Sequence, residues 1–198
     1  MSKSSSLLAA LAASGFLLAC GGAPEKVAAP EPMCFFQDGA GPYTTKAPNW
    51  VCDERHSEVG LAAVSSYRQS ASGYDFMVEM ATSRARQKLA GIISSKALGS
   101  AKDYRSNTGN NAANETVMAT SELTQKTLTN VVLTGSRVLT KTRNPATGQV
   151  YVLVGINDKD LPKVADAAAK AAFMNDEAEF QRFKASQNFK ELMSDLEN

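Results

Sequence analysis

The eight residues Gln149-Val150-Tyr151-Val152-Leu153-Val154-Gly155-Ile156 decide the fold of this chain. In a strand, the Val and Ile residues at the even-numbered positions share one face, and the Tyr and Leu residues share the other. A second run that is rich in β-branched residues, 131–141, precedes them, and the turn residues Asn-Pro and Gly lie between the two runs, in 144–148. Two such runs around a short turn predict a β-hairpin.

A third strand and a long helix are expected before the hairpin. Residues 59–67 form a short apolar run that fits a strand. Ser72 and Asp75 have the spacing of a capping box, and the apolar residues after them recur at steps of three and four. This pattern predicts a helix over 74–98 with one buried stripe.

Helices are also expected between the strands and after the hairpin. Residues 99–114 are polar and predict a loop, and residues 115–128 predict a second helix. Asp160 and Pro162 open a further helix, whose narrow face of small residues suits packing on a sheet. The charged tail, 176–198, carries spaced Phe, Leu and Met residues and predicts a C-terminal amphipathic helix. We expect the hairpin domain to fold without this tail.

The predicted fold class is therefore α+β. A small antiparallel sheet is built from one strand and, after intervening helices, the hairpin, and helices pack on one face of it. The C-terminal amphipathic helix is added to this arrangement. Residues 58–175 are expected to form a single domain, which is long enough to bury a core.

The amino terminus has the pattern of an export signal. An apolar run, 7–18, follows a positive charge and is far shorter than the ~20 residues needed to cross a bilayer. It ends in Leu17-Leu18-Ala19-Cys20, which resembles the lipobox of bacterial lipoproteins. That resemblance implies cleavage before Cys20 and attachment of a diacylglycerol to its sulfur. Residues 1–19 are interpreted as the signal peptide, and residues 20–32, rich in Pro, Ala and Gly, as a tether.

The other two cysteines, Cys34 and Cys52, form an even pair in a chain with an export signal, and disulfides persist in oxidising compartments. Residues 33–57 are therefore expected to be a loop region that a disulfide closes. Two free thiols are one alternative, and a metal site that adds His56 is another. Three ligands without close Cys spacing match zinc modules poorly.

The composition argues against a nucleic-acid binder and gives no support to an enzyme. Without residues 1–19, the chain has 20 basic and 20 acidic residues, so it has no overall attraction to nucleic acid. It contains no Gly-x-Ser-x-Gly elbow, Ser-x-x-Lys pair, Walker phosphate loop or Gly-x-Gly-x-x-Gly fingerprint. Asp158 and Asp160 lack the further ligands of a calcium loop. We therefore expect no catalytic residues, no cofactor and no metal site.

Two groups of residues are candidates for contact with a ligand or a partner. Arg84 and Lys88 lie four residues apart on one helix face, where they either meet a phosphate or glycan or are simply solvated. Tyr104-Arg105 would join them if they line a pocket. Phe180 and Phe183 lie on the apolar face of the tail helix, which either packs on the domain or docks on a partner.

Three stretches resemble the Lpp-twenty family of bacterial envelope lipoproteins: ATSRARQKLA (81–90), LTNVVL (128–133) and GQVYVLV (148–154). The resemblance spans roughly residues 59–173 and implies a lipobox that is coupled to one small α+β domain. Because Gly21 rather than Asp follows the lipobox cysteine, the sorting rule of lipoproteins implies the outer membrane. We expect the domain to face the periplasm. Members of the family include flagellum-associated lipoproteins, which build rings or disks around polar motors.

Two functions of different class follow from these patterns. In the first, the chain is a lipid-anchored outer-membrane lipoprotein with a non-catalytic structural or assembly role in the cell envelope. It would attach to the membrane through Cys20, associate with itself or with a larger assembly, and be tied to the flagellum if the family's role applies. In the second, it is a periplasmic binding module for a glycan, peptidoglycan or a small molecule.

Overall fold

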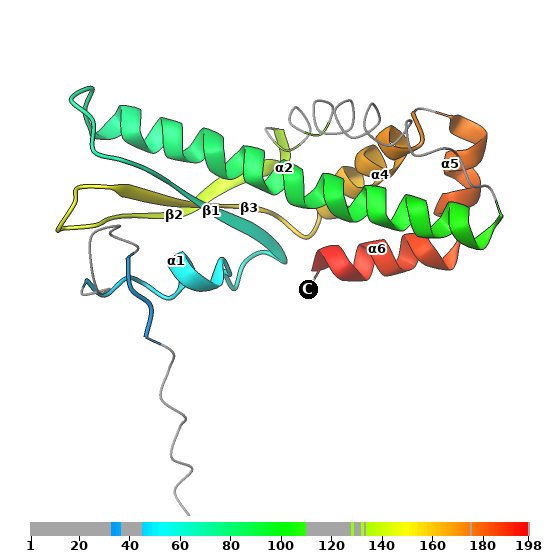
Figure 1. Ribbon diagram of the computed structural model, residues 1–198, viewed down its shortest axis with the longest axis horizontal. Helices are drawn as coiled ribbons and strands as arrows, with labels where there is room; N and C mark the ends of the chain where they lie inside the picture. The colour runs from blue at the N-terminus through cyan, green and yellow to red at the C-terminus, as the bar shows by residue number, and fades with distance from the viewer. Residues whose placement is uncertain are drawn as a thin grey trace, which may run out of the picture. The chain divides into compact units, whose positions relative to one another are not determined.

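The computed structural model describes residues 33–36, 45–109, 128, 132, 134–174 and 176–197. The fold is α+β, as predicted, and contains a three-stranded antiparallel sheet (Figure 1). The described helices and strands follow one another in this order: α1 (Trp50–Asp53), β1 (Leu61–Tyr67), α2 (Tyr74–Asn107), β2 (Ser136–Arg143), β3 (Val150–Ile156), α4 (Leu161–Ala172), α5 (Glu177–Lys184) and α6 (Gln187–Glu197).

The strand β3 is the centre of the sheet, which has the order β1-β3-β2. Every residue of β3 is buried, because the sheet is covered on both faces. Its Val and Ile residues at even positions join the larger core with α2 and α4, whereas Tyr151 and Leu153 join a smaller cluster on the opposite face. The predicted hairpin and the predicted assignment of its side chains to two faces are therefore confirmed.

Two glycines are required by the geometry of the hairpin. Gly148 ends the turn with a φ of +72°, a conformation that L side chains rarely adopt. Gly155 lies beneath Leu139, the extra residue of a β-bulge in β2, and beneath Val59. A Cβ atom at position 155 would lie 2.7 Å from side-chain carbons of both residues, so any other residue there would force both side chains to move.

The strand β2 begins later than the sequence pattern predicts. The β-branched run 131–141 was expected to be strand throughout, but Val132, Thr134 and Gly135 are helical and the strand starts at Ser136. Leu128 and Val132 lie four residues apart and are both fully buried, so helical spacing brings both to the core. Apart from Leu128, the predicted helix over 115–128 lies outside the described residues.

The helix α2 is longer than predicted and packs on two different neighbours. Its first half lies along the sheet, and its second half continues past the sheet to lie beside α4 and α6 (Figure 1). The sequence predicted an end near residue 98, because a glycine and a polar stretch follow. Gly99 instead lies inside the helix, on a side that faces open space, and Ala97 and Ala101 beside it are buried. Their burial offsets the cost of about 1 kcal/mol for a glycine in a helix.

The helix starts differ from the predicted capping pattern. Gly73, not Ser72, is the N-cap residue of α2, and no side chain caps that end. Pro162 lies in the first turn of α4 as predicted, but Asp160 makes no side-chain cap bond there. The clear cap is Asp176, whose carboxylate accepts a hydrogen bond from the backbone N–H of Glu179 at 3.0 Å and starts α5.

The tail forms two helices rather than one, and both pack on the domain. The break lies at Ala185 and Ser186, where the Ser186 hydroxyl donates to the carbonyl of Phe183 at 2.6 Å. The Ser100 hydroxyl of α2 donates to the carbonyl of Asn188 at 2.9 Å, which ties α6 to the second half of α2. The tail thus contributes side chains to the larger core, which argues against the expectation that the domain folds without it.

Candidate functional site

The predicted disulfide between Cys34 and Cys52 is present, with an S–S distance of 2.03 Å. Cys34 is buried and Cys52 is exposed. Both sulfurs are used in this bond, so the alternative metal site with His56 is not formed. His56 instead lies in a turn, where its Nδ1 accepts a hydrogen bond from the backbone N–H of Glu58 at 3.3 Å.

The segment that the disulfide closes covers the second face of the sheet. The Phe36 ring, two residues after Cys34, is almost fully buried, with its centroid 5.0 Å from that of Tyr151. Trp50 and Val51 of α1, just before Cys52, pack against the same cluster. The sequence predicted a loop here but gave no sign that it covers the sheet, because its apolar residues are few and irregularly spaced.

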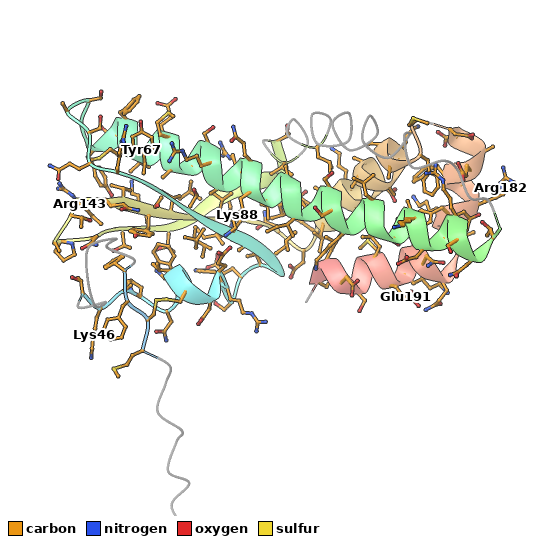
Figure 2. All side chains as sticks on the ribbon, viewed as in Figure 1. Lys46, Tyr67, Lys88, Arg143, Arg182 and Glu191 are labelled. Carbon is orange, nitrogen blue, oxygen red and sulfur yellow. A yellow bond between two sulfur atoms is a disulfide. The ribbon has the colours of Figure 1, made fainter. Side chains whose placement is uncertain are left out.

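Arg84 and Lys88, the candidate ligand contacts, lie at the outer edge of β1. The Arg84 guanidinium stacks over the Tyr67 ring, 4.7 Å from its centroid, and donates to the carbonyl of Ser66 at 3.4 Å. Lys88 reaches from α2 to the carbonyl of Val64 at 3.5 Å (Figure 2). Both side chains therefore approach backbone oxygens that β3 does not use.

Glu54 completes this arrangement from the other side of the edge. It follows α1, forms an ion pair with Lys88, and accepts a hydrogen bond from the backbone N–H of Val64 at 3.3 Å. We call Glu54, Arg84 and Lys88 the edge guard. The sequence analysis missed Glu54, since a glutamate next to a disulfide-closed loop carries no signal of a contact with a strand ten residues later.

Tyr104-Arg105, which were candidates for the same pocket as Arg84, belong to a different cluster. The Arg105 guanidinium binds the Glu179 carboxylate through two nitrogens at 3.1 and 3.2 Å and lies over the Phe173 ring, 4.6 Å from its centroid. The Tyr104 ring meets both Phe173 and Phe183 edge-on. Both side chains therefore hold α5 and the end of α4 against α2.

The polar candidates for ligand binding do not converge on one site. They are Arg84, Lys88, Tyr104 and Arg105. Arg84 and Arg105 are 21 positions apart on the same straight run of helix, which corresponds to about 30 Å. The first reaches the sheet, and the second reaches the tail helices. The structure thus gives each of them a local structural partner and does not bring them together.

Phe180 and Phe183, the candidate partner contacts, are buried in the core of the domain. Phe183 is 0% exposed and contacts the rings of Phe173 and Phe189, with centroids 5.0 and 5.7 Å away. Of the two alternatives for the tail, packing on the domain is the one that the structure contains.

At the exposed start of α5, hydrogen bonds from Lys170 and then Gln181 lower the pKa of Glu177 from its ordinary value.

The predicted lipid site, Cys20, and the tether after it lie outside the described residues. Within the part of the chain that is described, no helix is long and apolar enough to span a bilayer. Comparison of the chain with models of protein families and with the sequences of curated proteins finds no match.

Proposed function

We propose that this chain is a lipid-anchored lipoprotein of the bacterial outer membrane with a non-catalytic structural or assembly role in the cell envelope. Cys20 would carry the lipid, residues 20–32 would be the tether, and the folded domain would face the periplasm. No catalytic residue, cofactor or nucleic acid enters this proposal.

The disulfide between Cys34 and Cys52 is the observation that carries the proposal. Disulfides persist in oxidising compartments and are rare in the cytosol, so this bond fits a chain that is exported. It also leaves Cys20 as the one cysteine of the three without a partner in the disulfide, at the position where a lipobox requires a free sulfur. The proposal thus assigns a role to every cysteine in the chain.

The structural part of the proposal is supported by what the polar candidates do. Arg84, Lys88 and Arg105 bind groups of the same chain, and each of these contacts holds one element of the domain against another. The alternative, a binding module for a glycan or a small molecule, depended on their convergence near one pocket. A role in flagellar rings or disks is a narrower form of the assembly proposal and depends on the resemblance to the Lpp-twenty family alone.

Self-association can be tested on a chain that starts at Gly21, which lacks the lipid and contains every described element of the fold. We expect light scattering over a range of concentrations to show a closed oligomer or growth towards one. The disulfide must be intact in the sample, which a mass measurement without reductant establishes. A monomer at every concentration would contradict self-association and would favour the binding module instead.

A further inference from the structure

The outer edge of β1 is the feature from which more can be inferred. In an antiparallel strand, alternate residues turn their backbone N–H and C=O groups away from the neighbouring strand. In β1 these are the even-numbered residues Ala62, Val64 and Ser66, since Val64 turns its N–H to Glu54 and its C=O to Lys88, and Ser66 turns its C=O to Arg84. An open row of such groups is a template on which another strand can pair.

The edge guard occupies this row with side chains. Val64 has both of its backbone groups engaged, its N–H by Glu54 and its C=O by Lys88, and Arg84 engages the C=O of Ser66. The three side chains come from two elements, α2 and the residue after α1, that meet at the edge. The side chains of Lys88 and Glu54 are 44% and 33% exposed, so solvent reaches the pair that closes the edge.

The strand β1 itself is suited to pairing with a second copy of this chain. Its sequence, LAAVSSY, contains no charged residue. An antiparallel pair centred on Val64 would place Val64 opposite its own copy and Ala62 opposite Ser66, which are small or β-branched residues that fit side by side. The other outer strand, β2, carries Arg137, Lys141 and Arg143, so a pair of β2 strands would bring like charges together.

We propose that the β1 edge is a latent surface for pairing with the β1 edge of a second copy of this chain, and that the edge guard keeps it closed. The guard satisfies the same backbone groups that a partner strand would bind, so pairing requires Glu54 and Lys88 to leave. The disulfide fixes Cys52, two residues before Glu54, and so holds the acidic half of the guard in place. The inference concerns the β1 edge itself and holds with or without a lipid on the chain.

The test is the double variant Glu54→Ala/Lys88→Ala, which leaves the net charge unchanged. Its matched control is Glu79→Ala/Lys102→Ala, which removes one exposed acid and one exposed base from α2. The readout is the hydrogen exchange of the Val64 amide, followed by NMR from micromolar to millimolar protein. We expect exchange in the guard variant to slow at least about tenfold with rising concentration, together with a gain in dimer mass, since the paired amide becomes protected.

The control variant and the native chain should show no dependence of Val64 exchange on concentration. Exchange that is independent of concentration in the folded guard variant would overturn the proposal, and so would pairing through Val64 in the native chain. If the double variant does not fold, Glu54→Ala/Lys88→Met is the second variant, because methionine keeps an apolar stem on the sheet while the acceptor at Val64 and the lysine donor are both removed. Because the readout is specific to Val64, assembly of the native chain through another surface would support the proposed function without altering this result.

Discussion

Deletion of residues 176–198 is expected to abolish the cooperative unfolding of the domain. The tail carries four buried large side chains, Phe180, Phe183, Leu192 and Leu196. Burial of one such side chain stabilises a fold by about 1.5–3 kcal/mol, so the deletion lowers the free energy of unfolding by roughly 6–12 kcal/mol. This is comparable to the whole stability of a typical domain, about 5–15 kcal/mol. Thermal unfolding followed by circular dichroism measures the effect.

Glu191→Ala provides the control for this deletion, because Glu191 lies exposed on α6 (Figure 2). It should unfold like the native chain. A truncated chain that still unfolds in one sharp transition near the native temperature would show that the sheet and α2 form a complete core without α5 and α6. That result would restore the expectation from the sequence that the tail is separable.

Removal of the disulfide, by Cys34→Ala together with Cys52→Ser, is expected to lower the stability by about 3 kcal/mol on the chain-entropy model. Alanine is chosen for the buried position and serine for the exposed one, so that no polar group is buried. For a chain of this length, the loss corresponds to a decrease of roughly 6–12 °C in Tm. The physical reason is that the bond restricts the unfolded chain between residues 34 and 52, so without it more conformational entropy is lost when the segment with Phe36 and Trp50 packs on the sheet.

Scanning calorimetry with and without reductant provides the comparison. Reductant should lower the Tm of the native chain to that of the double variant and should leave the variant unchanged. Equal Tm values for the native chain and the variant would mean that the disulfide contributes nothing to the stability, and that non-covalent contacts alone hold the covering segment.

The sequence predicts the hairpin well because the alternation of side chains along β3 is set by the two faces on which they are buried. The residues of β3 alternate between two covered faces, and both faces are visible in the pattern Val-Tyr-Val-Leu-Val. The disulfide was predictable from the number of cysteines, since two cysteines remained once Cys20 was assigned to the lipobox.

The C-terminal end of α2 and the start of β2 were not predictable, because packing between distant segments overrides local preference there. The glycine at 99 and the β-branched residues near 132 both favour an end of helix, but α2 continues and Val132 is helical. In each case buried neighbours on the core side stabilise the helix by more than the local cost. The tail is buried for the same reason, through contacts with α2, which is distant in the sequence, such as that of Ser100 with Asn188, 88 positions apart.

The edge guard also lies beyond what the sequence indicates. Glu54 and Lys88 are 34 positions apart, and both appear in the sequence as ordinary charged surface residues. Only the topology shows that they meet at the edge of β1. The basic pair on α2, which suggested a ligand, thus has a structural explanation within the chain.

The most direct test of lipid anchoring is metabolic labelling of the full chain with a fatty acid analogue in a bacterial host. We expect the native chain to be labelled and the variant Cys20→Ser to be unlabelled, because the thioether to the diacylglycerol requires the Cys20 sulfur. The variant Cys34→Ala/Cys52→Ser serves as the control and should remain labelled, since it keeps Cys20. Label on the Cys20→Ser variant, or none on the native chain, would contradict the proposal that this protein is a lipoprotein.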